Sequence, residues 1–157
     1  MTNRGKQFED IIKKSFEKVP NVSIDRLHDQ MNGYWGSKNI SDFIVYKKPY
    51  EYYIECKSVN THTLPFTNIT DKQWSGMLEK SKIKGVIAGV ICWYIQDDTT
   101  LFLPIGLLQN FKNLGKKSVR FDDVDTRIIH INGEKKRVFY DYAMDSFFHQ
   151  IEKQNRR

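Results

Sequence analysis

The chain has 157 residues, of which 39% are hydrophobic and 13% aromatic, so it can fold around a core and is not a disordered chain. No apolar run reaches the roughly 18 residues that a membrane span needs, and the opening MTNRGKQFED lacks the apolar stretch of a secretion signal. The net charge of +6 comes from small Lys/Arg clusters, which form either solvated faces or a surface for a polyanion. We expect one domain over residues 1–157, in the cytoplasm and without a membrane partner.

The hydrophobic pattern alternates between helical and strand periods along the chain. It predicts, in order, a helix over 5–18, a strand over 22–29, a loop over 30–39, a hairpin over 41–58, a loop over 60–70, a helix from Thr70 or Asp71 to about Ile83, a buried strand over 85–95, a strand over 100–105, a short helix ending near Gly115, two short strands around an Asn132-Gly133 turn, and a helix over 143–154. This order predicts an α/β (α+β) fold, a mixed β-sheet flanked by helices.

Cysteine and histidine usage argues against a zinc site. Cys56 and Cys92 both lie in apolar, strand-like runs, so we expect two reduced and buried thiols. The four histidines are scattered and offer no ligand spacing. His62 follows the predicted hairpin closely enough to be considered for a functional role, although a polar loop residue is the simpler interpretation.

The predicted hairpin SDFIVYKKPYEYYIECKS places charged residues at the open end of two apolar strands. If the turn centres on Lys48-Pro49, Asp42 lies opposite Glu55, and Lys57 shares their face because side chains alternate along a strand. Two carboxylates this close repel each other unless a cation lies between them. Mg²⁺, or Mn²⁺ in its place, would neutralise both, and Lys57 would then stabilise negative charge on a phosphate. The alternative is an ion pair that only makes the hairpin soluble.

The spacing D-x₁₂-E-x-K resembles that of the PD-(D/E)XK nuclease superfamily, and the rest of the chain resembles its RecU-type Holliday junction resolvases. The segments that carry this resemblance are NRGKQFED, SDFIVY with YIECKS, LPFTNITDKQWSGM, LFLPIGLL and GKKSVRF, which together cover roughly residues 3 to 121. The resemblance implies a restriction-endonuclease-like fold and a metal-dependent endodeoxyribonuclease that cuts four-way DNA junctions. It also implies a bacterial or phage-encoded protein that acts as a homodimer, because a junction requires two matched cuts.

The resemblance also assigns roles to single residues. Asp42 and Glu55 match the metal-binding carboxylates, Lys57 the catalytic lysine, and Gln73 a glutamine of the metal site. Glu9 matches the acid of the first helix, and it either reaches the site or borders it. The residues that we expect to contact DNA are Arg4, Lys6, Arg26, Tyr34, Trp35, Lys38, Lys116 and Lys117.

Two features depart from the family pattern. Ile40 and Ser41 stand before Asp42, where this branch carries Thr, and the interval over 29–40 is too short for the family's stalk. Tyr34 and Trp35 either stack on unpaired bases in place of the stalk or simply pack down. A restriction or nicking nuclease and a catalytically inactive DNA-binding module are the remaining alternatives. For the dimer contact, we expect the apolar face of either the first or the last helix.

Overall fold

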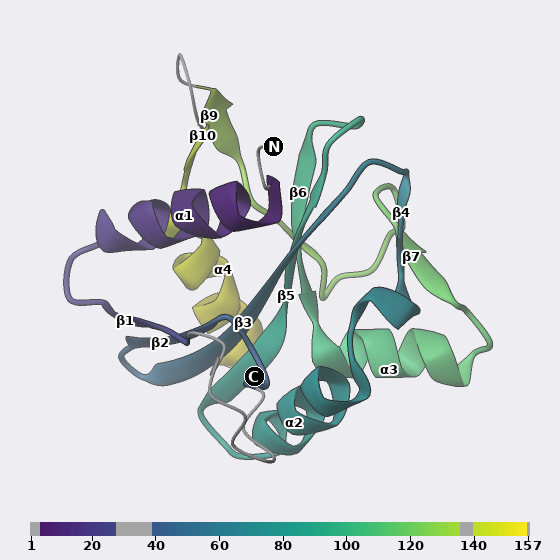
Figure 1. Ribbon diagram of the computed structural model, residues 1–157. Helices are drawn as coiled ribbons and strands as arrows, with labels where there is room; N and C mark the ends of the chain where they lie inside the picture. Colours follow the sequence, from purple (N-terminus) through teal and green to yellow (C-terminus); the bar gives the residue numbers. More distant parts are fainter. Residues whose placement is uncertain (1–3, 28–38, 136–139, 157) are drawn as a thin grey trace, which may run out of the picture.

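Six strands form a mixed sheet through the centre of the molecule, with helices on both of its faces (Figure 1). The computed structural model describes residues 4–27, 39–135 and 140–156. Its elements are α1 (Arg4–Glu17), β1 (Ser23–Arg26), β2 (Phe43–Lys47), β3 (Tyr50–Val59), β4 (Thr63–Pro65), a 3₁₀ turn (Phe66–Asn68), α2 (Asp71–Ser81), β5 (Val86–Tyr94), β6 (Thr99–Pro104), α3 (Ile105–Asn113), β7 (Ser118–Arg120), β8 (Ile129–His130), β9 (Gly133–Lys135), β10 (Tyr140–Tyr142) and α4 (Met144–Asn155).

The strand order in the central sheet is β1-β2-β3-β5-β6-β8. The β3–β5 pair is parallel and the other pairs are antiparallel. A parallel pair needs a crossover connection, and the chain from β4 through α2 supplies it. Strand β5 lies inside the sheet and has an apolar core on each of its faces, which explains why its sequence is a nearly continuous apolar run. The predicted mixed sheet flanked by helices is confirmed.

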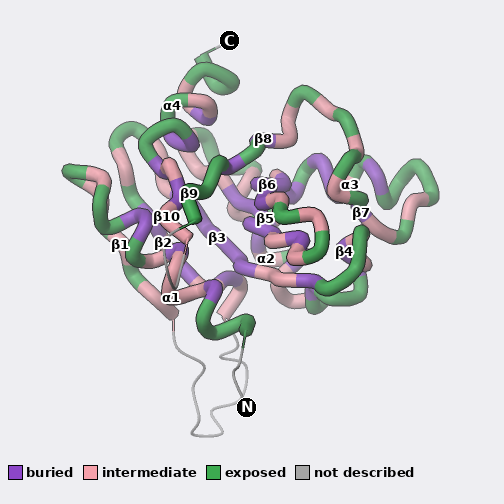
Figure 2. The backbone as a smooth tube through the Cα atoms, turned by 90° about the horizontal axis from the view of Figure 1, so that it is seen from above, coloured by how far each residue is buried: buried purple, intermediate pink, exposed green. Residues whose placement is uncertain are grey.

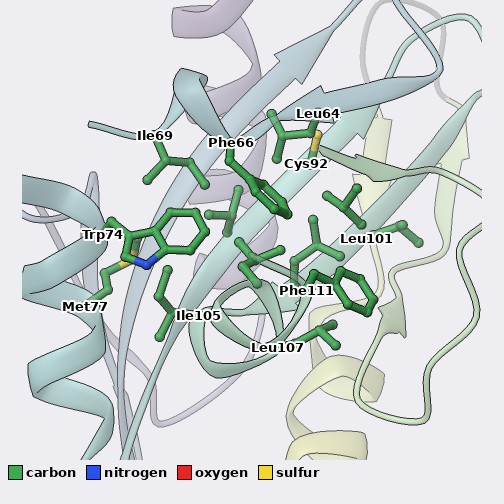
Figure 3. Close-up of a cluster of buried hydrophobic side chains, with 14 of the residues drawn as sticks. Leu64, Phe66, Ile69, Trp74, Met77, Cys92, Leu101, Ile105, Leu107 and Phe111 are labelled. Carbon is green, nitrogen blue, oxygen red and sulfur yellow. The ribbon is translucent and has the colours of Figure 1, made fainter. Parts of the chain in front are cut away.

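Each face of the sheet has its own apolar core. Helices α1 and α4 cover one face, where Phe8, Ile12, Phe16, Phe147 and Phe148 pack on β2 and β3. Helices α2 and α3 cover the other face through Trp74, Met77, Leu107, Leu108 and Phe111, part of the cluster drawn in Figure 3. Figure 2 shows the central strands buried, and the outer turns and helix surfaces exposed.

This burial corrects the predicted dimer contact. The residues expected to make this contact are at most 1% exposed and fill one core within the chain: Phe8, Ile12 and Phe16 of α1, and Phe147, Phe148 and Ile151 of α4. Neither set is therefore available to a second copy of the protein. The prediction failed because an amphipathic pattern shows that a face is buried but not what buries it.

Most predicted elements lie within two or three residues of their positions in the structure, and two segments differ. The predicted loop over 60–70 contains β4, which pairs with β7, and the 3₁₀ turn. The predicted hairpin turn at Asn132-Gly133 is wrong, because β8 pairs with β6 and β9 pairs with β10. Gly133 lies against the ring of Tyr142, where a Cβ would collide, so close packing rather than a turn requires glycine there.

The predicted state of the two cysteines agrees with the structure. Cys56 and Cys92 are free and buried. Within the described part of the chain, no helix is both long and apolar enough to cross a bilayer.

Candidate active site

Asp42 lies where the chain enters β2 between β1 and β3. The observed register pairs Phe43 with Ile54, as the sequence predicts, so Asp42 is next to Glu55 across the ladder. Its backbone N–H donates to the Ile54 carbonyl at 3.1 Å, and its carbonyl accepts from Leu27 at 2.7 Å. Its carboxylate Oδ2 accepts from the backbone N–H of Cys56 at 2.8 Å. The sheet therefore fixes both the backbone and the carboxylate of Asp42.

Glu55 is a buried carboxylate with only part of its hydrogen-bonding capacity used. Its side chain is 4% exposed, and Oε2 accepts from Lys57 Nζ at 2.9 Å and from Gln73 Nε2 at 3.0 Å. Its other oxygen, Oε1, is buried without a hydrogen-bond partner among the described residues. An unpartnered buried carboxylate oxygen is costly, so this site favours an additional cation.

The electrostatics of the pair lead to the same conclusion. Burial and then the charge of Glu55 raise the pKa of Asp42 to about 8, although the Cys56 N–H opposes the shift. Burial also raises the pKa of Glu55, against the lowering effect of Lys57. Without a cation, the two carboxyl groups therefore share a proton near neutral pH.

Gln73 reaches this cluster from α2, and its amide nitrogen faces Glu55. Thr70 caps α2 by accepting from the Gln73 N–H at 3.1 Å, and Gln73 Oε1 accepts from the Thr70 N–H at 3.0 Å. This capping box uses the amide oxygen and leaves the amide nitrogen facing Glu55. In this arrangement Gln73 orients Glu55 and does not present an oxygen to a metal.

Glu9 also reaches the cluster, from α1. Its carboxyl group lies within hydrogen-bonding reach of Asp42, and its charge contributes to raising the Asp42 pKa. Arg26 on β1 contacts Glu9 Oε2 and Asp10 Oδ1, each at 2.6 Å. The guanidinium thus lies between two carboxylates, and its role in this structure is to hold Glu9 in place.

The other residues expected to contact DNA are dispersed. Arg4 donates to Asn60 at 3.0 Å near the end of β3, and Lys6 is exposed on α1. Lys116 and Lys117 follow α3, and Lys116 pairs with Asp123 at 3.1 Å. The predicted contacts Tyr34, Trp35 and Lys38 lie outside the described residues.

The segment before Asp42 is held by packing. Ser41 donates its hydroxyl to the Phe43 carbonyl at 3.0 Å, so this hydroxyl is engaged with the backbone. Ile40 packs on α2 at Gly76, where a Cβ would collide with the isoleucine side chain.

His62 is half exposed, and its Nδ1 contacts the Asp97 carboxylate at 2.9 Å.

Three parts of this arrangement were not predicted from the sequence: the capping box of α2, the ion pairs of Arg26 with Glu9 and Asp10, and the contact between Ile40 and Gly76. The first had a readable signal, because Thr70-x-x-Gln73 is a capping-box pattern. The other two join elements that are far apart in the chain and leave no local pattern.

The donor set fits a hard divalent cation. Among the described residues, no three His, Cys, Asp or Glu side chains are gathered as a ready-made metal cage. Asp42 and Glu55 nevertheless supply two adjacent carboxylates, and one of their oxygens lacks a partner. Mg²⁺ typically binds through one or two carboxylates and keeps waters or substrate phosphates as its other ligands.

The known proteins that resemble this one do so over most of the chain. No curated protein sequence matches it significantly. One similar solved structure is that of Archaeoglobus fulgidus Hjc, described as a Holliday junction resolvase from an archaeal hyperthermophile. That structure shares 14% identity with a TM-score of 0.49, over 66% of this chain and 75% of that chain. Residues 6–145 match the family of RecU, recombination protein U. Since this match spans most of the sequence, the chain belongs to the RecU family of Holliday junction resolvases, nucleases that act in DNA recombination.

Proposed function

We propose that this protein hydrolyses phosphodiesters of four-way DNA junctions at the Asp42–Glu55–Lys57 cluster, with Mg²⁺ as cofactor and Mn²⁺ as a possible substitute. The observation that carries this assignment is the buried, unpartnered Oε1 of Glu55 beside Asp42, whose pKa is raised. Such a pair is unfavourable for folding alone and becomes favourable once a cation binds. We further propose that residues 1–157 act as one nuclease domain, in the cytoplasm, where bacterial or phage DNA recombines.

Asp42 and Glu55 are the proposed metal ligands. When bound, Mg²⁺ would polarise the scissile phosphate and lower the pKa of a bound water. The two carboxylates then no longer need the shared proton. Gln73 donates to Glu55 Oε2 and keeps that carboxylate oriented. Glu9, held by Arg26, adds negative charge next to Asp42 and increases the affinity for a cation.

Lys57 is the proposed catalytic cation. Its ammonium lies 2.9 Å from Glu55 Oε2 and is 21% exposed, so it is fixed on one side and open on the other. An ammonium has three donors, which leaves two for a phosphate oxygen or the attacking water. Charge grows on the phosphate oxygens during attack, and a fixed cation in a poorly hydrated site stabilises that charge more than the ground state.

The proposed substrate and assembly follow from the need for paired cuts. Two identical sites related by a two-fold axis would cut symmetric strands of a junction, so we propose a homodimer. The proposed phosphate contacts include Arg4, Lys6, Lys116 and Lys117, with Tyr34, Trp35 and Lys38 in the segment before Asp42.

The test compares a labelled four-way junction with a duplex of the same arm sequence, each with and without Mg²⁺. The proposal expects paired nicks in the junction that require the metal, and no cleavage by Asp42→Asn even though this variant binds the junction. Cleavage of plain duplex at a defined sequence would instead identify a restriction or nicking enzyme. Binding without cleavage in any divalent metal would identify an inactive DNA-binding module.

A further inference from the structure

A cavity of about 630 Å³ lies between the first turn of α2 and the chain that follows α3. Its floor is aromatic and apolar, formed by Phe66, Ile69 and Trp74, which are only 4–8% exposed. The Phe66 and Trp74 rings pack edge to face with centroids 5.4 Å apart, and Figure 3 shows Ile69 beside them. Trp74 Nε1 donates to Gln109 Oε1 at 2.7 Å, so the indole is held in one orientation.

Lysine residues line the opposite side of this cavity because the chain reverses at Gly115. Gly115 has a φ of 88°, which favours glycine, and the Lys116 N–H returns to the Phe111 carbonyl at 3.0 Å. This turn places Lys116 and Lys117 on the same cavity as Lys112 in the last turn of α3. The Lys112 ammonium lies 4.9 Å from the centre of the Trp74 ring.

The charge of the cavity is positive. Lys116 is partly neutralised by Asp123, and Asp71 is the one acidic residue among the described cavity-lining residues. Among the described residues, Lys112 and Lys117 form no ion pair with a carboxylate, so both ammonium groups can bind an anion at the edge of the apolar floor. Charges at the edge of such a surface bind an anion more strongly than fully hydrated charges do.

The cavity adjoins the catalytic cluster through one turn of helix. Thr70 and Asp71 in this turn line the cavity beside the floor residue Trp74, and Gln73 in the same turn donates to Glu55. The first turn of α2 therefore contributes residues both to the cavity and to the cluster proposed to hold the scissile phosphate.

We propose that the cavity binds one nucleotide of the cut strand, next to the scissile phosphate. Its phosphate lies on Lys112 and Lys117, and its base lies against the Phe66–Trp74 floor. The volume is within the range of small-ligand sites, and aromatic surfaces accept any base because every base has an apolar face. Strands lose stacking at the centre of a junction, and such an unstacked nucleotide is what this cavity would hold. This inference rests on the proposed function and adds a substrate subsite to it.

The first experiment measures junction binding in EDTA as a function of salt, with the full chain. The variant Lys112→Gln/Lys117→Gln removes the two cations of the cavity. The control Lys48→Gln/Lys84→Gln removes the same charge near the start of β3, away from Glu55 and Lys57: Lys48 lies in the turn before β3, and Lys84 lies between α2 and β5. We expect the slope of log K against log[salt] to become shallower by about one for the cavity variant, because the proposed nucleotide supplies one phosphate and each neutralised phosphate contributes about 0.9. We expect the control to stay within about half a unit of the parent. Equal slopes for the two variants would overturn the phosphate contact.

The second experiment tests the base. A single abasic site is moved along the cut strand of the junction, and the affinity is measured at each position. One position near the scissile phosphate should weaken parent binding by roughly 5- to 100-fold, the range expected for a stacked base. The cavity variant should lose this dependence on position. A flat profile in the parent would overturn the nucleotide assignment. These binding data do not depend on cleavage, so a parent that fails to cut junctions would refute the proposed function separately.

Discussion

Replacing Asp42 with Asn should stabilise the metal-free protein, although it removes the proposed metal ligand. The pKa of Asp42 is raised to about 8 by burial and by the charge of Glu55, from an ordinary value of 3.8. At pH 7 the folded protein therefore holds this carboxyl group protonated, while the unfolded chain ionises it. From the ordinary pKa of 3.8 to pH 7 is roughly three pH units, which correspond to about 4 kcal/mol of lost stability. Asn has the same shape, can still accept from the Cys56 N–H, and has no proton to retain.

We expect a gain in the free energy of unfolding of about 2–4 kcal/mol at pH 7, or roughly 5–15 °C in Tm for a chain of this length. Because the folded pKa is raised, the penalty is absent below about pH 4, grows as pH rises toward 8, and is constant above that. The assay is thermal unfolding in EDTA from pH 4 to pH 9, for the parent and for Asp42→Asn. Saturating Mg²⁺ should stabilise the parent and leave the variant nearly unchanged.

Asp125→Asn is a control of opposite sign. The hydrogen bond from the Arg127 side chain, helped by the Arg127 backbone N–H, lowers the pKa of Asp125. Its contribution to stability is present above its ordinary pKa and is lost as pH falls through the lowered folded value. Asp125→Asn should therefore destabilise the protein at pH 7 and have no effect in strong acid. If Asp42→Asn were also destabilising at pH 7 in EDTA, or if its effect did not depend on pH, the Asp42–Glu55 pair would not be the strained pair described here.

Three further substitutions test the site from other elements. Lys57→Ala should slow single-turnover cleavage by about 10²–10³-fold and leave the junction affinity in Ca²⁺ unchanged within a few-fold. Lys57→Arg should not restore the rate, because the guanidinium of arginine is planar and larger than an ammonium. If Lys57→Ala lost affinity in proportion to its rate, Lys57 would be a phosphate-binding residue and not a catalytic one. Gln73→Leu should cost about 1–2 kcal/mol in urea unfolding, because it removes the Gln73 side-chain bond of the capping box and a bond to a buried carboxylate, while the backbone bond to Thr70 remains. An unchanged free energy of unfolding would contradict that geometry. Gly76→Ala should weaken Mg²⁺ binding measured by calorimetry, because the new Cβ would displace Ile40, which stands two residues before the proposed ligand Asp42. Gly106→Ala is the control, because its Cβ would meet nothing within 4 Å and Mg²⁺ binding should be unchanged. Equal effects of the two substitutions would refute the packing argument.

The sequence by itself determined the parts of this protein that depend on local period. Alternation along the hairpin and the position of its turn were enough to place Asp42 opposite Glu55, with Lys57 on the same face. A strand has a side-chain period of two, so a correct turn fixes which residues share a face. The apolar run over 85–95 likewise predicted a buried strand, and β5 contributes side chains to the cores on both faces of the sheet.

Only the tertiary structure decided the contacts between elements that are distant in the chain. The sequence placed Gln73 near the carboxylates, but the direction of its amide depends on Thr70 and Glu55 together. The sequence predicts Arg26 as a DNA contact, and only the packing of α1 against β1 shows that its guanidinium lies between two carboxylates. The cavity beside α2 likewise exists because the chain after α3 returns to it through the β4–β7 pair. Periodicity specifies which face of an element is buried, whereas strand order and helix packing specify what that face meets, and these depend on the free energy of the whole fold.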